Sequence, residues 1–573
     1  MSRAPRSDAG SFRLRAWFAF GVLALGAGGL LARAVDLQLV DKEFLISQGD
    51  ARFTREVTTV ANRGAIVDRN GTPLAISTPV DSVWANPREL GVLPDRWPKL
   101  ASSLKRNRGE FTRRISSSQD RNFIWLARHL SPPDAAAVRK LDVPGVYFVR
   151  EHKRYYPAGE VVGHVLGFTN VDDEGQEGAE LAFDHWLAGE GGRKRVLQDR
   201  MGRKVEDIES IRTARAGRDL TLSLDMRIQY LAYRELKTAI AENRARSGSM
   251  VVMDVNTGEI LAMVNQPTFN PNDRAQLTAA MYRNRAATDI LEPGSSIKPF
   301  VVAAALESGR FDAASIIDTS PGFVKVGNKV VEDEHPQGAL GLAGILAKSS
   351  NVGMTKVALA LEPQQIWTTL TQFGFGHVTA SGFPGESAGV LSNYASWKPT
   401  GIASLSYGYG LSVTPLQLAQ AYATLGAMGV ARPVSMLRRD DAVAGERVMS
   451  AHNAATLIGL LESVVAEGTG AKAAITGYRV AGKTGTAKIN QAGTYFDDRY
   501  TAVFGGVAPA SNPRLAAVVV IDDPAAGRYY GGDISAPVFS AVVGGALRLM
   551  GVAPDAAGSN IDPLTGVATM VQR

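Results

Sequence analysis

The pattern of hydrophobic and polar positions begins with one long apolar run close to the N-terminus. Residues 16–32 (AWFAFGVLALGAGGLLA) contain no charged side chain. That length is at the lower limit for a helix that spans a bilayer, about 17–25 residues. Apolar positions then continue through Val35, Leu37, Leu39 and Val40. Residues 16–35 are therefore predicted to form a single transmembrane helix.

The charges that precede this run predict its orientation. Four arginines stand against one acid, namely Arg3, Arg6, Arg13 and Arg15 against Asp8. A positive flank favours a cytoplasmic segment at residues 1–15 and export of the remainder. A cleaved signal peptide is the alternative, because Ala32-Arg33-Ala34 has the A-x-A form. The run is longer than the usual apolar core of a signal peptide, about 7–15 residues, so an uncleaved anchor is favoured.

Strand patterns follow the anchor. Residues 63–67 and 74–77 alternate as two strands around an Asn70-Gly71 turn, which predicts a β-hairpin. The composition changes near Arg218. We therefore place one exported domain at residues 36–218 and a second at 219–552.

The second exported domain has strands at both ends of a largely helical middle. The patterns predict strands at 220–224, 250–254, 259–264, 500–507 and 515–521, and helices at 228–240 and 538–549. This order favours an antiparallel sheet with helices packed on it, an α+β fold. Residues 553–573 show little periodicity and are predicted to be a flexible tail.

Composition narrows the function classes. The 573 residues suggest three or four units, and the net charge is +6. Lysine and arginine are dispersed without an aromatic-plus-basic motif, so nucleic-acid binding is not expected. The absence of cysteine excludes disulfides, thiol catalysis and cysteine-ligated metals. The seven histidines lack metal-ligand spacing, and we expect neither a metal nor a cofactor.

The first candidate motif is Ser295-Ser296-Ile297-Lys298, preceded by Pro293-Gly294. The Pro-Gly turn predicts a helix that begins at the serine, which places Ser295 and Lys298 on one face. A serine hydroxyl is a poor nucleophile unless a neighbouring base takes its proton. Lys298 can do so only when neutral, which requires burial or a nearby cation such as Lys483. An exposed Ser-Lys pair on a helix is the alternative.

Two further motifs supply polar groups. Ser349-Ser350-Asn351 is interpreted as an extended loop whose first and third side chains point into a cleft, or as a helix N-cap. Lys483-Thr484-Gly485-Thr486 is interpreted as an edge strand with little bulk. Gly485 would let a peptide lie close to the backbone, while Lys483, Thr484 and Thr486 present a cation and two hydroxyls to a terminal carboxylate.

The three motifs in this order are the signature of serine β-lactamases and penicillin-binding proteins, and the chain resembles a penicillin-binding transpeptidase. The hairpin at Arg63–Ser77 and the segments 154–157, 163–167 and 175–180 resemble the pedestal domain of class B members. The resemblance implies an α+β transpeptidase domain behind an elongated pedestal and one membrane helix. It implies that Ser349 relays a proton to the departing amine, that Asn351 holds Lys298 and the substrate amide, and that the backbone N–H groups of Ser295 and Thr486 form an oxyanion hole.

The segment 406–419 resembles the division-specific, FtsI-type enzymes. The resemblance implies a D,D-transpeptidase that cross-links septal peptidoglycan from the periplasmic side of the inner membrane. Implied partners are stem peptides ending in D-Ala-D-Ala, β-lactams and an FtsW-type glycan polymerase. Tyr500 is a candidate wall of the cleft, with core packing as the alternative. Other open functions are an elongation-specific transpeptidase, a carboxypeptidase or β-lactamase, and a non-enzymatic membrane scaffold.

Overall fold

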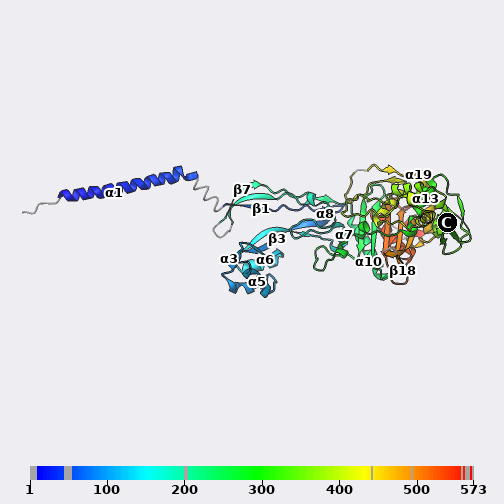
Figure 1. Cartoon of the computed structure of the whole chain (residues 1–573), viewed down its shortest axis with the longest axis horizontal. Helices are drawn as coiled ribbons and strands as arrows, with labels where there is room; N and C mark the ends of the chain where they lie inside the picture. The colour runs from blue at the N-terminus through cyan, green and yellow to red at the C-terminus, as the bar shows by residue number, and fades with distance from the viewer. Residues whose placement is uncertain are drawn as a thin grey trace, which may run out of the picture. The chain divides into compact units, whose positions relative to one another are not determined.

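The computed structural model describes residues 9–43, 54–198, 204–440, 443–491, 494–556, 559–561 and 568–570. The chain forms two compact units (Figure 1), one from residues 1–62 and 189–216, the other from 63–188 and 217–573. Much of the predicted cytoplasmic segment and of the predicted flexible tail lies outside the described residues. Within the tail, β20 (Ser559–Ile561) pairs antiparallel with β21 (Ala568–Met570).

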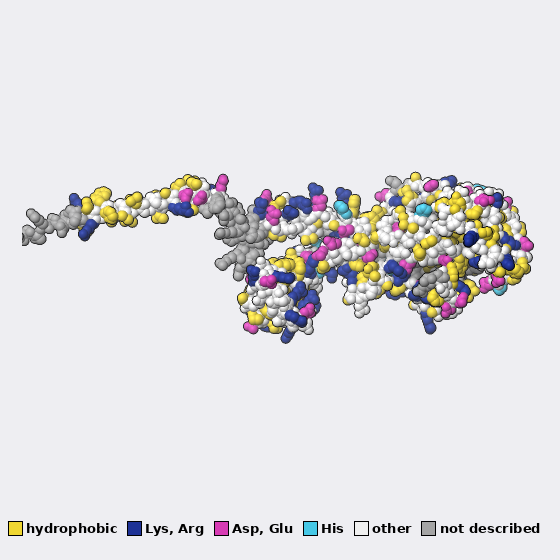
Figure 2. All heavy atoms as spheres, viewed as in Figure 1, with side chains coloured by type: hydrophobic (Ala, Val, Ile, Leu, Met, Phe, Trp, Pro, Cys, Tyr) yellow, Lys and Arg dark blue, Asp and Glu magenta, His cyan; other side chains and the backbone are white. Residues whose placement is uncertain are grey.

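The first unit contains the predicted anchor. Helix α1 (Ala9–Val35) continues into a π-helical turn at Asp36–Val40. Hydrophobic side chains lie exposed along this helix in Figure 2, and an 18-residue window within Phe12–Val40 has a mean hydropathy of 1.8. In the described part of the chain it is the one helix long and apolar enough to cross a membrane. The same unit holds an antiparallel sheet of β1 (Thr54–Thr59), β6 (Gly192–Gln198) and β7 (Lys204–Arg212).

Residues 63–188 of the second unit, here called the pedestal segment, build a small sheet with helices. Its strands are β2 (Ile66–Val67), β3 (Pro73–Ala85), β4 (Ile124–Leu130) and β5 (Val146–Tyr155). Its helices are α3 (Pro87–Leu90), α4 (Trp97–Ser103), α5 (Arg108–Ser116), α6 (Pro132–Lys140), α7 (Gly163–Leu166), α8 (Gly178–Ala182) and α9 (Asp184–Leu187). The predicted hairpin is confirmed, because β2 and β3 pair antiparallel.

The prediction of a strand at 220–224 was wrong in the length of the strand and in the strand that it pairs with. Only β8 (Leu220–Thr221) forms, and it pairs parallel with β2 of the pedestal segment instead of joining the larger sheet. The next residue, Leu222, makes an isolated bridge to Leu437. Alternation identified buried positions here, but it could not identify the strand that they pair with.

The larger sheet has five antiparallel strands in the order β10-β9-β19-β18-β17. They are β9 (Ser247–Asp254), β10 (Ile260–Gln266), β17 (Ala481–Gln491), β18 (Thr494–Ala508) and β19 (Leu515–Asp522). Helices α10 (Met226–Glu242) and α20 (Gly531–Leu549) pack together on this sheet. The sequence predicted these strands and both helices, although β17, β18 and α20 are longer than predicted, and the α+β fold is confirmed.

Helices from the middle of the chain share the core on the opposite face of the sheet, where α18 (Pro415–Gly426) and α19 (Ala451–Ala466) contact the strands. The other helices of this core are α13 (Lys298–Glu307), α14 (Leu342–Lys348), α15 (Asn351–Leu359), α16 (Pro363–Gln372) and α17 (Pro399–Ser406). Shorter elements complete this region, namely α11 (Ala279–Tyr282), α12 (Arg285–Thr288), β11 (Ile316–Asp318), β12 (Phe323–Val326), β13 (Lys329–Glu332), β14 (Ala339–Gly341), β15 (Val430–Ala431) and β16 (Glu446–Arg447).

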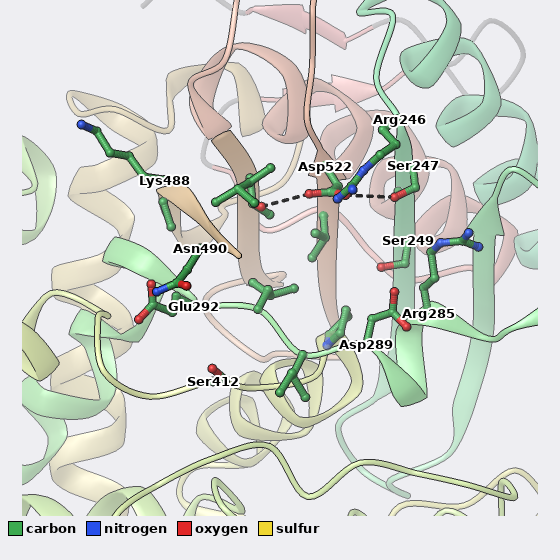
Figure 3. Close-up of a pocket in the computed structure, with 18 residues that line it drawn as sticks. Arg246, Ser247, Ser249, Arg285, Asp289, Glu292, Ser412, Lys488, Asn490 and Asp522 are labelled. Atoms are coloured by element: carbon green, nitrogen blue, oxygen red, sulfur yellow. Dashed lines mark hydrogen bonds and ion pairs between the residues drawn. The ribbon is translucent and has the colours of Figure 1, made fainter. Parts of the chain in front are cut away.

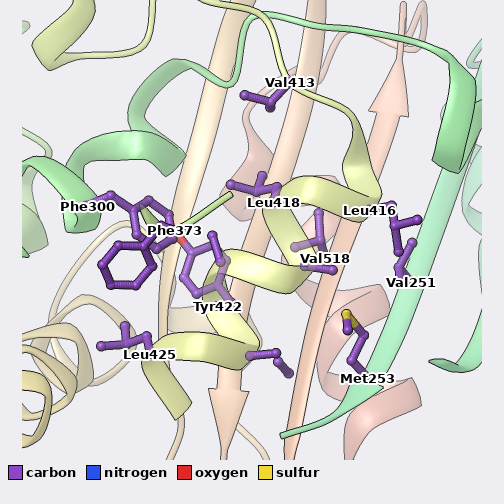
Figure 4. Close-up of a cluster of buried hydrophobic side chains, with 14 of the residues drawn as sticks. Val251, Met253, Phe300, Phe373, Val413, Leu416, Leu418, Tyr422, Leu425 and Val518 are labelled. Carbon is purple, nitrogen blue, oxygen red and sulfur yellow. The ribbon is translucent and has the colours of Figure 1, made fainter. Parts of the chain in front are cut away.

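The hydrophobic core between this face of the sheet and the helices holds the turn that carries the candidate site. Figure 4 shows α18 lying over the strands that carry Val251 and Val518. The rings of Phe300 and Tyr422 meet edge to face with centroids 5.2 Å apart, a favoured aromatic geometry. The Tyr422 hydroxyl donates a hydrogen bond of 3.1 Å to the carbonyl of Ser296. The turn before α13 is thereby tied to the core.

Candidate active site

Ser295 lies in a 3₁₀ turn, Gly294–Ile297, that leads directly into α13. Ser296 locks this turn, because its hydroxyl donates to the Pro293 carbonyl at 2.7 Å. Ser295 is half-buried and lines a cavity of about 640 Å³. Among the described residues no side chain is hydrogen-bonded to its hydroxyl. The hydroxyl therefore faces the cavity unengaged.

Lys298, at the start of α13, has no exposed side-chain surface. Its Nζ donates to the Ser349 carbonyl at 2.5 Å and to Asn351 Oδ1 at 2.8 Å. A third contact, 3.2 Å long, reaches Ser349 Oγ. The carbonyl of Ser349 and the amide oxygen of Asn351 accept two N–H groups of the Lys298 amine, and the Ser349 hydroxyl is its third contact. The expected proximity of these motif residues is therefore present.

Ser349 and Asn351 line the cavity from a corner between two helices. The predicted extended loop was wrong. Ser349 ends α14 in the left-handed conformation with φ 58°, and Asn351 is the first residue of α15. The helix N-cap is the middle residue, Ser350, whose hydroxyl accepts from the Gly353 N–H at 2.9 Å. A tight corner between two helices therefore presents the two side chains.

Asp333 anchors this corner and was not among the residues predicted from the sequence. Its Oδ1 accepts the backbone N–H groups of Asn351 at 2.6 Å and Val352 at 2.9 Å. Its Oδ2 accepts the Ser350 hydroxyl at 2.6 Å. A carboxylate on the first N–H groups of α15 complements the helix dipole. No local spacing marks this residue, because it lies 16 positions before Ser349 in a loop after β13.

Strand β17 is the edge of the sheet, as predicted, and runs along the Ser295 turn. A Cβ on Gly485 would lie 2.6 Å from the Pro293 carbonyl oxygen, so only glycine fits there. A Cβ on Gly294 would lie 3.0–3.3 Å from backbone atoms of Thr486. These approaches bring the backbone of Thr486 beside the turn that carries Ser295.

Lys483 completes the polar network from β17. It is fully buried, and its Nζ donates to Ser349 Oγ at 3.1 Å and to the Thr484 carbonyl at 3.2 Å. The Ser349 hydroxyl thus lies between the amino groups of Lys298 and Lys483. Thr484 Oγ1 lies 2.7 Å from Thr469 Oγ1, and Thr486 Oγ1 accepts the Gly531 N–H at 3.1 Å.

Burial sets the protonation of both lysines. Desolvation, followed by the charge of Lys483, lowers the pKa of Lys298 well below its ordinary value, and Asp333 opposes this only in part. Desolvation lowers the pKa of Lys483 to about 7. Both lysines therefore lose their protons at lower pH than an exposed lysine does. Burial and a neighbouring cation were both expected to act on Lys298, and burial has the larger effect on its pKa.

Tyr500 lies outside the set of side chains that line this cavity. Its ring stacks on Tyr529 with centroids 4.2 Å apart, and Tyr529 stacks in turn on Tyr530 at 4.6 Å. Tyr530 does line the cavity. The described residues contain no group of three His, Cys, Asp or Glu side chains placed to hold a metal ion.

Family comparisons match nearly the whole chain. Residues 248–544 match the penicillin binding protein transpeptidase domain, and residues 58–222 match the penicillin-binding protein dimerisation domain. The peptidoglycan D,D-transpeptidase FtsI of Escherichia coli K12 is 45% identical over 543 residues, covering 94% of this chain and 92% of that protein.

Solved structures agree. Penicillin binding protein 3 from Mycobacterium tuberculosis, complexed with aztreonam, has a TM-score of 0.69 at 28% identity, covering 87% of this chain and 98% of that one. The transpeptidase domain of Burkholderia pseudomallei penicillin-binding protein 3 has a TM-score of 0.54 at 40% identity, covering 58% of this chain and 98% of that one.

Proposed function

The chain belongs to the class B penicillin-binding proteins, and we propose that it acts through an acyl-enzyme on Ser295. Its function is that of a peptidoglycan D,D-transpeptidase of the FtsI type, the transpeptidase of septal division. The observation that carries the Ser295 mechanism is the contact of two buried lysines with one hydroxyl, Ser349 Oγ, beside an unengaged serine.

Acylation begins with loss of the Ser295 hydroxyl proton to neutral Lys298. The Ser295 oxygen attacks the carbonyl carbon of the penultimate D-alanine of a donor stem peptide. The C–N bond then breaks, and the departing D-alanine amine takes a proton through the Ser349 hydroxyl. General-base assistance of this kind contributes about 10²–10⁴-fold to a rate.

The edge strand positions the donor. The Lys483 ammonium, with the hydroxyls of Thr484 and Thr486, receives the terminal carboxylate of the stem. The N–H groups of Ser295 and Thr486 stabilise the oxyanion of the tetrahedral intermediate, a contribution of about 2.7–4 kcal/mol per donor in known acyl-transfer sites. β-Lactams present an equivalent carboxylate and carbonyl, and acylate Ser295 by the same route.

Transfer to an acceptor amine completes the reaction. The amine of a second stem peptide attacks the acyl carbonyl and loses a proton, while the Ser295 oxygen leaves and regains one. Tyr500 supports the cleft only through the stack that ends at Tyr530. A hydrolase would require a base that activates water in place of the amine.

The N-terminal helix supports the proposed location. Phe12–Val40 crosses the inner membrane once, residues before it stay in the cytoplasm, and the catalytic region lies in the periplasm at the septum. The proposed partner in the membrane is an FtsW-type glycan polymerase. Deletion of residues 1–40 is expected to leave penicillin acylation intact and to abolish support of division. Full complementation by an exported truncated form would contradict this.

Intact-mass spectrometry with penicillin tests the nucleophile. Wild type is expected to gain one adduct that maps to the Ser295 peptide, and Ser295→Ala is expected to gain none. Ser349→Ala is the matched control, because it removes a hydroxyl from the same network and should acylate more slowly but at the same site. Labelling of Ser295→Ala at the wild-type rate would assign the chemistry to another residue.

Product analysis separates transfer from hydrolysis. The full-length enzyme is incubated with a pentapeptide stem ending in D-Ala-D-Ala and an amine acceptor. Cross-linked dimer is expected, and free tetrapeptide as the sole product would indicate a carboxypeptidase.

A further inference from the structure

The helical part of the pedestal segment concentrates the positive charge of the chain. Residues 96–121, here called the basic surface, contain eight Lys and Arg residues against two Asp and Glu residues. Their net charge of +6 equals that of all 573 residues, so the charges of the remaining chain balance. A local excess of one sign of charge attracts ligands of the opposite sign.

The fold turns these cations outward. Helices α4 and α5 contact each other and bury Trp97 and Phe111 in the core of the pedestal segment. All eight Lys and Arg side chains are exposed. Arg108 Nη2, at the start of α5, lies 3.4 Å from Ser102 Oγ on α4, which joins the exposed sides of the two helices. Figure 2 shows Lys and Arg side chains at several points of the lobe that Figure 1 labels α3, α5 and α6.

Most of these cations have no counter-charge within the chain. Among the eight, only Lys105 forms an ion pair with another described residue, Asp134, at 2.8 Å. By contrast, two cations at the cavity shown in Figure 3 are paired, Arg246 with Asp522 and Lys488 with an exposed aspartate. Seven unpaired positive charges therefore face solvent on the basic surface, where an anionic ligand would neutralise them.

The apolar residues of the basic surface indicate which kind of anion fits. Within residues 96–121, all of them described, no large hydrophobic side chain is exposed. Folded protein partners usually bind through buried aromatic anchors, and peripheral membrane helices insert apolar side chains. A flexible polyanion needs neither of these. Carboxylates repeated along one polymer can engage several cations at once, which adds weak contacts into a stable complex.

We propose that the basic surface binds the carboxylates of stem peptides on peptidoglycan strands. This inference rests on the proposed function, because it takes the polymeric substrate of the enzyme as the ligand. The pedestal segment belongs to the same compact unit as the acylation cleft. A strand held by the basic surface is therefore kept at a high local concentration for the cleft.

Sedimentation with insoluble, purified peptidoglycan tests the proposal. The full-length protein in neutral detergent is first treated with penicillin, which occupies the acylation cleft. Saturable binding is expected, and it should weaken at least about tenfold between about 0.05 and 0.5 M salt, because salt screens exposed charges. Peptidoglycan whose carboxylates have been converted to amides should also bind at least about tenfold more weakly, because the anions are lost.

Two double variants assign the binding to the basic surface. Arg113→Gln/Arg114→Gln removes two unpaired cations from α5 and should weaken binding at least about fivefold. Lys325→Gln/Lys398→Gln is the matched control, because it removes two exposed cations elsewhere in the same unit that have no ion pair among the described residues. The control should bind within about twofold of wild type. Both variants should be acylated by penicillin at the wild-type rate.

A fluorescent label separates peptidoglycan from anionic lipid. The chain has no cysteine, so Thr112→Cys on the exposed side of α5 provides one site for an environment-sensitive dye. In the full-length protein held in phosphatidylcholine nanodiscs, the dye should respond to soluble, uncross-linked peptidoglycan strands. It should not respond when phosphatidylglycerol replaces part of the phosphatidylcholine. The opposite pattern would assign the basic surface to lipid head groups and overturn the proposal.

Two further results would overturn the proposal. One is equal binding of native and amidated peptidoglycan, and the other is equal binding by Arg113→Gln/Arg114→Gln and wild type. If penicillin fails to label the wild-type protein, the proposed acylation fails, yet the comparison of the two double variants still decides this inference.

Discussion

The pedestal segment and the acylation cleft both bury charged side chains, but they treat the charge in opposite ways. In the pedestal segment Arg63 and Arg154 donate to the two oxygens of Glu180 at 2.8 and 2.6 Å, and all three are buried. Burial alone lowers the pKa of Arg63, but Glu180 and Asp184 outweigh it and the net pKa is raised. Arg63 therefore stays ionised.

The cleft buries two lysines without an adjacent carboxylate. Lys298 and Lys483 donate to carbonyl, amide and hydroxyl oxygens, while Asp333 is engaged by the helix corner. Desolvation therefore lowers both pKa values. The partner decides what burial does to the pKa: a paired carboxylate keeps a buried cation charged, and without one burial lowers the pKa of a buried amine.

The largest expected effect comes from breaking the pedestal pairs. Glu180→Gln leaves Arg63 and Arg154 buried beside a neutral amide, and we expect a loss of about 3–5 kcal/mol in the free energy of unfolding. Urea denaturation measures it. Asp172→Asn is the control. Asp172 also pairs with an arginine, Arg128, but its side chain is exposed, so we expect a loss of no more than about 1 kcal/mol in the free energy of unfolding.

The acylation rate of the protein that remains folded should change less than twofold in Glu180→Gln. If Glu180→Gln has the same free energy of unfolding as wild type, the Glu180 carboxylate does not stabilise the two buried arginines as expected.

Removing Lys298, the proposed base, should affect the acylation rate instead of folding. Lys298→Met keeps a side chain of similar length, and we expect the second-order rate of penicillin acylation to fall by about 100-fold or more. Lys356→Met on α15 is the control and should acylate at the wild-type rate. Acylation by Lys298→Met within threefold of wild type would exclude Lys298 as the base.

Lys483 should show a smaller, pH-dependent effect. Lys483→Ala is expected to lower acylation by about 10–100-fold, the worth of a charge-assisted hydrogen bond to the carboxylate of the substrate. Because the pKa of Lys483 is about 7, wild-type acylation should decline as pH rises above that value. Lys483→Arg stays protonated and should lose this alkaline decline while keeping partial activity.

Rates measured from pH 5 to 10 decide the role of Lys483. Identical profiles for Lys483→Ala and wild type would mean that this strand does not bind the carboxylate.

The smallest effect concerns a buried ionisable group outside the cleft. Desolvation lowers the pKa of His164 to about 4, and its Nε2 lies 2.9 Å from the Met281 carbonyl. The pKa of His164 in the folded state lies below the unfolded value of about 6.5. Its contribution to the free energy of unfolding is therefore full above pH 6.5 and is lost as the pH falls toward 4.

Between pH 7.5 and 5.5 that loss should be about 1 kcal/mol, and His164→Gln should remove it from the pH dependence of urea unfolding. An unchanged slope in this window would show that another group carries the acid sensitivity.

The sequence predicted most of the features that depend on local residue patterns, namely the helices, the strands and the motif residues. Periodicity located α10, α20, β9, β18 and β19, and the motif order identified Ser295, Lys298 and the edge strand with Lys483. It could not place β8 beside β2, because alternation marks burial without naming the neighbouring strand.

Long-range contacts account for the other differences. Ser349 adopts a left-handed corner because α15 begins two residues later, under the hydrogen bonds of Asp333. Asp333 leaves no signature in local spacing, and its role becomes visible only when distant segments are brought together.

Direct titration of the cleft lysines tests the comparison most directly. The protein is labelled with [ε-¹³C]lysine, and Lys298→Met and Lys483→Arg assign the two resonances. We expect Lys483 to titrate near pH 7 and Lys298 to remain neutral well below pH 10.5. Exposed lysines ordinarily titrate above about pH 10. If both resonances titrate in that range, burial does not lower the pKa values of Lys298 and Lys483, and the proposed role of burial is wrong.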